Sequence, residues 1–443
     1  MKRKVLIVSF LFPPAENIGA LRVGKLAKYL PEFGWEPIIL TVNKVQDSQQ
    51  TMPLEIAEPE IKRTPYFTYY SIAAKWLIHD EQISEPNLTQ QGGRKKNPWK
   101  INANALRWTK GFYSIPIISR WLLDPMGWYS YAVKAGLEIV NKNNIDIIYS
   151  SFPPSTSHMI ASRLHRQTKI PWVAEFRDPW SMNRYLKQTQ PFHLFEVFWE
   201  KRTLKNCEYI VDVSETLAKV QRKLHSKNTI VIPNGFDEAD YSENVPPISK
   251  FCITYTGNII VGKTDPSPLF RALAELNQEK KITPKEIELR FFGNNFQPFS
   301  SLIDDYGIKE YVKIFGFVPL KKSIEKQKES TVLLFMSWND PRGAGTLSGK
   351  LHEYIGAGKP ILALSLKGGE IYNLLQETGC GVIVNDVSEI KSVLLKWLKE
   401  FNDEGKIISF YHPNKDNIKK YTRREQARKL AELFEKVHSN IIE

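Results

Sequence analysis

The sequence predicts an α/β protein built of two doubly wound, Rossmann-like domains that face a cleft. In both halves of the chain, short apolar runs alternate with segments of helical periodicity, which is typical of parallel sheets. The length of 443 residues exceeds what one core usually holds and favours two domains. A polar stretch at 236–250, which contains Pro246 and Pro247, reads as the linker between them.

The N-terminal domain is expected to span residues 1–240. Its first apolar run leads through a loop into a helical segment that ends at Gly34. Residues 45–125 break the alternation, and we interpret them as an insertion on this domain. The expected strands are 5–10, 36–42, 145–151, 172–176, 209–214 and 229–235, with further helices from about Ser155 and over 215–225.

The C-terminal domain is expected to span residues 241–415 and to repeat the same architecture. A helix is predicted near 267–278, and a last helix over 422–437 begins with the capping-box pattern of Thr422 and Glu425. The expected strands are 251–257, 287–293, 312–318, 331–337, 360–364 and 381–384.

The charge balance points to an anionic partner. Lys and Arg number 61 against 48 acidic residues, a net charge of +13, which suits nucleic acid, an anionic membrane or a phosphorylated substrate. Residues 94–123 carry basic residues interleaved with Trp, Phe and Tyr and no acid. This segment is either a solvated loop or an element that contacts a membrane surface, and we favour the second. No nucleic-acid-binding module is visible, so a nucleic acid partner is not expected.

The cysteines give no sign of a metal site or a disulfide framework. Cys207, Cys252 and Cys380 lie far apart, without metal-ligand spacing to the eight histidines. A reducing compartment is therefore favoured, and no metal is expected. The apolar N-terminus reads as a first strand rather than a signal peptide, and no run is long enough to predict a membrane-spanning helix.

Each predicted domain has polar loops at the ends of its strands, where open α/β sheets bind ligands. In the first half, "FPPAENIG" leads into a helix at Gly19, where the backbone and free N–H groups could approach an anion. An ordinary tight turn is the alternative. In the second half, "TGNIIVGK" places Asn258 and Lys263 at a strand end, and Lys263 is either a phosphate partner or a solvated lysine.

The stretch "GAGTLSGKLHEYIGAGKPILAL", residues 343–364, holds the second loop of that half. If a helix begins near Thr346–Ser348, its first amides could hold a diphosphate. Lys350 and Glu353, three residues apart, share a face of that helix. They form either a surface pair that stabilises the helix by about 0.3 kcal/mol, or a site in which Lys350 neutralises phosphate and Glu353 accepts hydrogen bonds from sugar hydroxyls.

The ordered loops resemble the retaining glycosyltransferases of family 4, which have the GT-B fold. The similarity covers nearly the whole chain except 45–125. It is carried by five segments in the family's order: the Gly19 loop with its helix and second strand, "IDIIYSSFPPSTSHMIA" with "VAEFRDPW", "VIPNGFD", "TGNIIVGK" and "SGKLHEYIGAGKPIL".

The resemblance implies a nucleotide-diphosphate sugar as donor, transfer with retention of configuration, and neither metal nor other cofactor. It implies that the last segment, 416–443, packs back on the N-terminal domain. Without a metal, the leaving diphosphate must be met by cations and backbone amides. Lys263 and the amides of Gly345, Thr346, Leu347 and Ser348 would do this, Glu353 would bind the nucleotide ribose, and Gly19 would serve the phosphate side of the first domain.

Two positions depart from the family's pattern, and two further candidates have alternative roles. Gly345 stands where the first glutamate of the paired-glutamate motif is expected, and Asn258 stands where the family often has arginine. Lys350 or Arg342 could supply the missing contacts. His158 lies near the position of the family's catalytic histidine, with a packed helix residue as the alternative. Asp178 could face the cleft or cap a turn.

These observations predict a glycosyltransferase that moves one sugar to a saccharide or lipid-linked acceptor in cell-envelope polysaccharide synthesis. The expected location is the cytoplasm, peripheral at the inner face of the membrane. A non-catalytic scaffold or sugar-nucleotide sensor is one alternative, because Gly345 and Asn258 replace expected charges. A nucleotide-sugar epimerase on the same fold is another.

Overall fold

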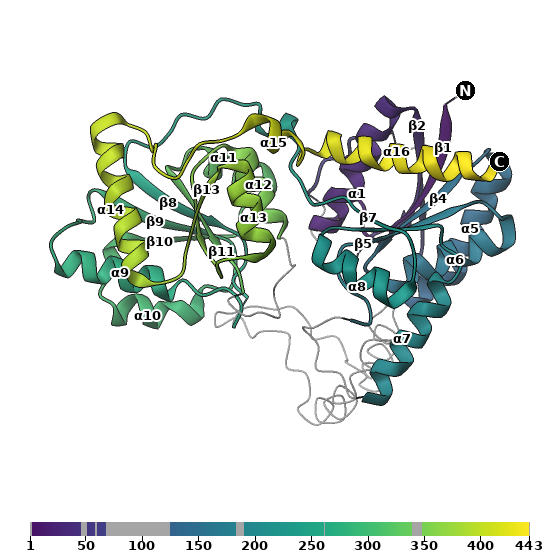
Figure 1. Ribbon diagram of the computed structural model, residues 1–443, viewed down its shortest axis with the longest axis horizontal. Coiled ribbons are helices and arrows are strands. Elements are labelled where there is room, and N and C mark those ends of the chain that lie inside the picture. The colour runs from purple at the N-terminus through teal and green to yellow at the C-terminus, as the bar shows by residue number, and fades with distance from the viewer. Residues whose placement is uncertain are drawn as a thin grey trace, which may run out of the picture.

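The computed structural model describes residues 2–45, 51–57, 60–67, 125–182, 190–260, 262–338 and 348–442. Over these residues the chain forms two parallel sheets, each covered by helices, in two domains that lie side by side (Figure 1). The predicted fold class is therefore confirmed. The alternation of buried strands and amphipathic helices dictates it, because parallel neighbours need a crossover connection on the face of the sheet.

The N-terminal sheet has the order β3-β2-β1-β4-β5-β6-β7. That order reverses between β1 and β4, so the connections after these two strands run to opposite faces and leave a crevice at their carboxyl ends. The strands are β1 (Arg3–Val8), β2 (Trp35–Val42), β3 (Ile61–Thr64), β4 (Ile147–Phe152), β5 (Trp172–Phe176), β6 (Tyr209–Asp212) and β7 (Thr229–Val231).

Both faces of this sheet are apolar. In β1, Val5 and Ile7 belong to the buried cluster on one face, whereas Leu6 and Val8 belong to the cluster on the other, as the two-residue period of a strand requires. The helices that cover the sheet include α1 (Ile18–Tyr29), α5 (Tyr129–Lys142), α6 (Ser155–Thr168), α7 (Gln190–Leu204) and α8 (Glu215–His225).

The sheet extends into the range that the sequence suggested was an insertion. Residues 61–64 form the edge strand β3, which pairs in parallel with β2 through Ile39 and Ile61. The four-residue strand is too short to stand out from its polar surroundings, which explains why the pattern of 45–125 read as a break. Most of that range, including the basic-aromatic segment 94–123, lies outside the described residues.

The C-terminal sheet has the order β10-β9-β8-β11-β12-β13, with its switch point between β8 and β11. Its strands are β8 (Phe251–Thr256), β9 (Ile287–Phe292), β10 (Val312–Gly316), β11 (Val332–Met336), β12 (Ile361–Leu364) and β13 (Gly381–Val384). Its helices are α9 (Ser267–Gln278), α10 (Ser300–Asp305), α11 (Leu320–Lys328), α12 (Gly349–Ala357), α13 (Gly369–Thr378), α14 (Val387–Glu404) and α15 (Lys415–Lys419).

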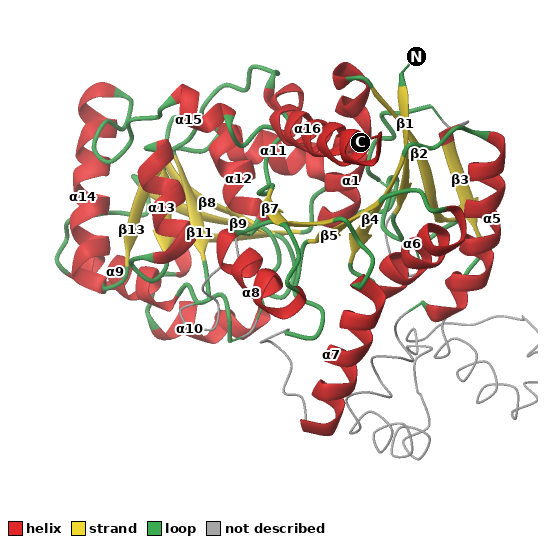
Figure 2. Ribbon diagram, turned by 45° about the vertical axis from the view of Figure 1, so that its right-hand side comes forward, coloured by secondary structure: helices red, strands yellow, loops and turns green. Residues whose placement is uncertain are grey.

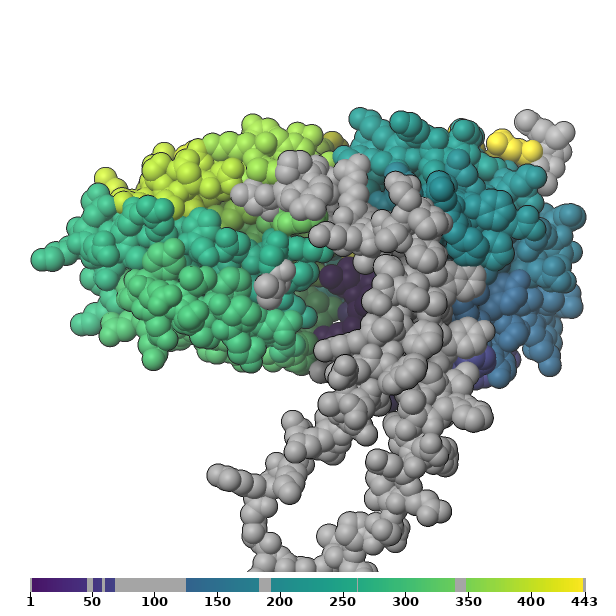
Figure 3. All heavy atoms as spheres, turned by 90° about the horizontal axis from the view of Figure 1, so that it is seen from below, coloured from purple at the N-terminus to yellow at the C-terminus, as the bar shows by residue number. Residues whose placement is uncertain are grey.

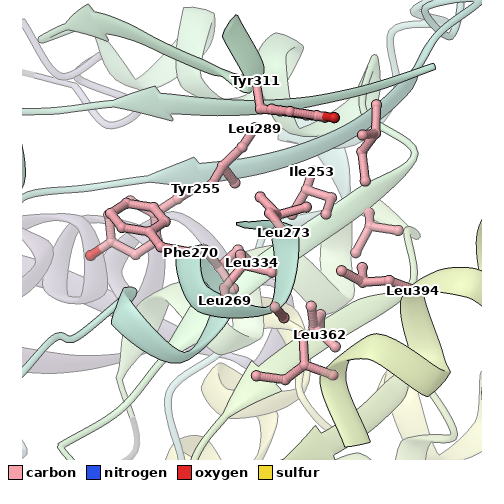
Figure 4. Close-up of a cluster of buried hydrophobic side chains, with 14 of the residues drawn as sticks. Ile253, Tyr255, Leu269, Phe270, Leu273, Leu289, Tyr311, Leu334, Leu362 and Leu394 are labelled. Carbon is pink, nitrogen blue, oxygen red and sulfur yellow. The ribbon is translucent and has the colours of Figure 1, made fainter. Parts of the chain in front are cut away.

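The core of this domain lies between the sheet and the pair α9 and α14. Ile253, Leu334 and Leu362 from three strands meet Leu273 of α9 and Leu394 of α14 (Figure 4). All five side chains are at most 1% exposed. Burying a side chain of this size contributes about 1.5–3 kcal/mol, so this layer fixes the sheet on which the strand-end loops are mounted.

The last helix, α16 (Arg423–Ile442), leaves the C-terminal domain and packs on the N-terminal one (Figure 1). Ala427, Leu430 and Phe434 join the buried cluster of the N-terminal sheet, and Phe434 meets Trp35 edge to face at 5.1 Å between ring centroids. The hydroxyl of Thr422 accepts the N–H of Glu425 at 3.2 Å and caps the helix.

The two chain segments that connect the domains run side by side. The N–H of Phe236 donates to the carbonyl of Tyr421 at 3.1 Å, and the N–H of Arg423 donates to the carbonyl of Phe236 at 2.8 Å. We call residues 233–241 and 420–424 together the hinge. Of the helices in the described part of the chain, none combines the length and apolar character needed to cross a membrane.

Candidate functional site

Two helix N-termini, one from each domain, meet across the interdomain cleft. A Cβ atom built on Gly349, the first residue of α12, would lie 3.3 Å from Cγ2 of Ile18, the first residue of α1. In the space-filling view, a hollow opens between the domains and N-terminal residues line part of it (Figure 3). Because helix N-termini attract anions, this meeting point favours a negatively charged ligand.

Side chains set where both helices begin. The carboxamide oxygen of Asn17 accepts the N–H of Gly19 at 2.7 Å and caps α1. The hydroxyl of Ser348 caps α12 and accepts the N–H of Lys350 at 3.4 Å. The helix expected to begin near Thr346–Ser348 therefore begins at Gly349. Arg342, Gly345, Thr346 and Leu347 lie outside the described residues.

Lys350 extends from the first turn of α12 toward the end of β8. Its Nζ donates to the hydroxyl of Tyr255 at 2.9 Å and lies 4.9 Å above that ring. Burial lowers the pKa of Lys350 to about 8, and the charge of Glu353 offsets only part of that effect. Gly257 makes room for this side chain, because its φ is +132° and a Cβ there would lie 2.1 Å from Nζ. The lysine is thus a half-buried cation, and within the described part of the chain no ion pair neutralises it.

The loop after β8 holds two further predicted site residues, Asn258 and Lys263. The carboxamide oxygen of Asn258 accepts the N–H of Asn294 at 2.9 Å, which braces this loop against the one after β9. Lys263 lies half-buried, with Nζ 5.5 Å above the ring of Trp338, which follows β11. The switch point between β8 and β11 therefore places Lys263 beside the residues that follow β11, and Asn258 beside Tyr255, the partner of Lys350.

Glu353 lies one turn further along α12, on the floor of the cleft. It lines a pocket together with Leu21 and Lys25 of α1 and Arg423 of α16. Burial raises the pKa of Glu353, and the charges of Lys350 and Arg423 partly offset that rise. Burial likewise lowers the pKa of Arg423 to about 9. A half-buried carboxylate on α12 and a buried guanidinium on α16 thus line the same pocket.

A buried ion pair that the sequence analysis missed anchors α1 to the hinge. Nε of Arg22 donates to Oε1 of Glu175 at 2.8 Å, and both side chains are fully buried. The same guanidinium donates to the carbonyls of Ile232 and Pro233, each at 2.8 Å. The charged residue inside the apolar strand "WVAEF" was the available signal, because an isolated buried carboxylate needs a partner.

The space beside the backbone of Gly19 is filled by a neighbouring side chain and is not open to a ligand. A Cβ there would lie 1.5 Å from Nη1 of Arg177, so only glycine lets this guanidinium pack beside the start of α1. Arg177 in turn donates to the carbonyls of Phe152 and Pro153 at 3.0 and 2.9 Å. The first turn of α1 therefore has a half-buried cation beside it, which strengthens its preference for an anion.

His158 and Asp178 occupy different environments. His158 is fully buried, its Nδ1 lies 2.7 Å from the hydroxyl of Ser150, and its ring packs on Phe152 and Phe176. Burial lowers the pKa of His158 to about 3, so the ring is neutral. This geometry favours the packed helix residue over a catalytic role. Asp178 is exposed just after β5 and remains a prediction.

An acidic cluster beside the cleft already has its cation. The carboxylates of Glu55, Asp237 and Asp240 lie within 4.8 Å of one another, a spacing that could hold a metal ion. Nζ of Lys25, however, lies 2.7–2.8 Å from an oxygen of each of them. An ammonium group therefore takes the central position, and the cluster reads as part of the hinge rather than as a metal centre.

Comparisons with known proteins agree with this architecture. Residues 93–240 match the family model described as Glycosyltransferase Family 4. A search of the curated proteins finds no match.

Among solved structures, sucrose-phosphate synthase from Thermosynechococcus elongatus is similar over 99% of this chain and 100% of that chain, with 13% identity and a TM-score of 0.60. The pneumococcal O-GlcNAc transferase GtfA, in complex with UDP and GlcNAc, has 10% identity and a TM-score of 0.59, with 98% and 99% coverage. A putative UDP-N-acetylglucosamine 2-epimerase from Listeria monocytogenes has 13% identity and a TM-score of 0.52, with 97% and 95% coverage. The chain has the GT-B fold.

Proposed function

We propose that the protein is a glycosyltransferase that takes a sugar from a nucleotide-diphosphate sugar. The observation that carries the proposal is the meeting of α1 and α12 at their N-termini, with Lys350 on the first turn of α12 and Glu353 one turn later. The diphosphate would lie against the first turns, beside Lys350, Lys263 and Arg177. The ribose hydroxyls would donate to Glu353.

The reaction needs stabilisation of the charge that develops on the leaving diphosphate. Fixed cations and helix N-termini in a partly dehydrated cleft can provide it. We propose that transfer proceeds with retention and without a metal, and that the loop 342–347 adds backbone amides to this site. The acceptor would be a saccharide or a lipid-linked saccharide of cell-envelope synthesis, bound against the N-terminal domain. The enzyme would then work at the inner face of the membrane, with 94–123 as one contact.

Donor binding is tested by thermal unfolding with a panel of nucleotide sugars and with UDP. A ligand at a hundred times its Kd stabilises the fold by about 2.7 kcal/mol, which corresponds to a rise in Tm of about 5–10 °C for domains of this size. Glu353→Gln should weaken binding about tenfold, since one hydrogen bond to a charged group is lost. It should also remove any preference for UDP over its deoxyribose analogues.

Glu310→Gln, at an exposed site in the C-terminal domain, is the matched control and should bind UDP as the wild type does. The proposal fails if no nucleotide or nucleotide sugar changes the Tm.

A nucleotide-sugar epimerase is the second candidate, favoured by the similarity in fold to the Listeria protein. Incubation with donor alone separates the two. An epimerase converts the donor to its epimer without an acceptor, whereas a transferase releases nucleoside diphosphate and does so faster when acceptor is present. A scaffold or sensor would bind nucleotide and yield neither product.

A further inference from the structure

The outward surface of α7 differs from an ordinary solvated helix. Leu194, Phe195 and Phe198 are 63%, 44% and 57% exposed, and all precede Trp199 in the helix. Leu194 and Phe198 are four residues apart and so share one face. Lys201, Arg202 and Lys205, just beyond them, are also exposed. We call these six residues the α7 outer face.

The acidic residues of α7 point the other way. Glu196 is 5% exposed and Glu200 is 1% exposed. Oε2 of Glu200 accepts the N–H of Ser181 at 2.8 Å, and Oε1 lies 3.2 Å from Nε2 of His225. With both carboxylates turned inward, the α7 outer face, as far as its side chains are described, presents apolar and cationic groups to its surroundings.

The helix also projects from the body of the protein. Leu204, at its C-terminal end, is 1% exposed and belongs to the core of the N-terminal domain. The opposite end extends beyond α6 and α8 (Figures 1 and 2). The apolar side chains therefore occupy the projecting part, and the basic side chains follow nearer the body.

We propose that the α7 outer face docks the protein on an anionic lipid bilayer. Apolar side chains on a projecting helix insert at the boundary of headgroups and acyl chains, while Lys and Arg beside them meet anionic headgroups. The ordering of the two groups along the helix matches that layering, because the apolar tip would reach deepest. Long basic side chains can extend along the interface at the same time.

The position of α7 in the fold explains how docking through this surface would help the enzyme. The helix follows β5, and in a parallel α/β sheet the connection after a strand leaves from the carboxyl edge, where the cleft opens. Docking through α7 would hold the acceptor side of the cleft at the bilayer. This inference rests on the proposed function, of which it specifies the membrane contact. Its test measures binding to lipid and not binding to donor. Failure of membrane docking can therefore be distinguished from failure of the proposed donor binding.

A site-specific probe tests the contact directly. Cys207, Cys252 and Cys380 are free but buried, so a single exposed cysteine can be labelled selectively with an environment-sensitive dye. In Leu194→Cys, the emission of the dye should shift to the blue on adding vesicles that contain phosphatidylglycerol. Ile314→Cys, which is 46% exposed in the wild type and lies on β10 of the other domain, should show no shift.

Co-sedimentation of the full chain with the same vesicles tests the contribution of the side chains. Leu194→Ser with Phe198→Ser should lower the partition coefficient about tenfold, and Lys201→Gln with Arg202→Gln and Lys205→Gln should lower it severalfold. The control Lys280→Gln with Lys281→Gln and Lys285→Gln, on the C-terminal domain, should bind as the wild type does. Tm shifts with UDP should be unchanged in all variants.

Three results would overturn the inference. One is a wild-type chain that does not sediment with the anionic vesicles. Another is vesicle binding that is unchanged in both α7 variants, which would place the contact elsewhere, such as in 94–123. The third is a blue shift at Ile314→Cys equal to that at Leu194→Cys. Binding of equal strength to pure phosphatidylcholine would overturn the role of the basic residues.

Discussion

Lys25 is buried and Lys350 is half-buried beside the same cleft, and the pKa values of the two ammonium groups shift in opposite directions. Burial alone would lower the pKa of Lys25, but hydrogen bonds to Asp237, Asp240 and Glu55 outweigh it and raise that pKa. Burial lowers the pKa of Lys350 to about 8, with only Glu353 acting against it. A lysine whose charge is fully met belongs to the framework, whereas one that is half-buried and poorly compensated is suited to an incoming anion.

The largest effect that we expect from this contrast is a difference in the stability of the variants Lys25→Met and Lys350→Met. Lys25→Met leaves the buried carboxylate of Asp237 and its neighbours short of a cation, and should lower the free energy of unfolding by about 3 kcal/mol. Lys350→Met removes a poorly compensated half-buried charge and should cost less than about 1 kcal/mol. Urea denaturation of both variants measures the difference. Equal losses in the two would break the comparison.

The next effect concerns binding. Only protonated Lys350 can pair with a diphosphate, whose own charge is complete above its second pKa of about 6. The affinity for UDP should therefore fall by up to about tenfold per pH unit above pH 8. Lys350→Arg keeps its charge and should flatten this dependence, and Lys350→Met should bind weakly at every pH. Calorimetric titration from pH 7 to 9.5 measures it; a wild type whose affinity is flat in pH would contradict the role.

The same shift predicts how stability depends on pH without ligand. The folded-state pKa of Lys350 lies below its unfolded value of about 10.4, so between pH 8 and 10.4 the unfolded chain binds more protons. The contribution of Lys350 to stability should therefore rise with pH in this window, by about 1 kcal/mol per unit. For Lys25, whose pKa is raised, the contribution is complete below about pH 10.4 and is lost above its folded pKa.

Subtracting the curve of Lys350→Met from that of the wild type isolates the first of these slopes. A difference that is flat between pH 8 and 10 would show that Lys350 is solvated like a surface lysine.

Sequence reasoning singled out Lys350 as a candidate site residue but did not single out Lys25, whose charge is met by carboxylates beside the hinge. Glu353 and Lys350 stood out because a donor-rich loop precedes a helix that carries both. Lys25 and Arg22 appeared only as charges in a helical segment, since their partners Asp237 and Glu175 lie 212 and 153 residues away in the chain. Such pairings depend on topology, and periodicity cannot reveal them.

Gly19 shows the same limit at a single position. The glycine at the helix start was expected to let a ligand approach the backbone, whereas the group that lies against it is the guanidinium of Arg177. His158 was recognisable as a histidine near the right place, and its neighbours Phe152 and Phe176 come from two different strands. By contrast, the doubly wound parallel fold class followed directly from the alternation of apolar runs and helical segments, because each parallel neighbour needs its own crossover.

The smallest effect that we expect comes from a weaker contact at the other side of the cleft. Oε1 of Glu370, in the first turn of α13, accepts the N–H of Thr216 in the first turn of α8 at 2.7 Å. It thus joins the two domains through a helix N-terminus. Glu370→Gln should lower the free energy of unfolding by only about 0.3–1 kcal/mol, measured by urea denaturation. A loss as large as that of Lys25→Met would show that this contact, and not the hinge, dominates the attachment of the domains.

The return of α16 to the first domain has a consequence for synthesis of the chain. Ala427, Leu430, Leu433 and Phe434 complete a core whose other members, such as Val5 and Trp35, leave the ribosome first. The whole C-terminal sheet is translated before α16 appears. The domain that is made first is therefore the one whose folding finishes last, and until then its face beside β1 stays open to water and to chaperones.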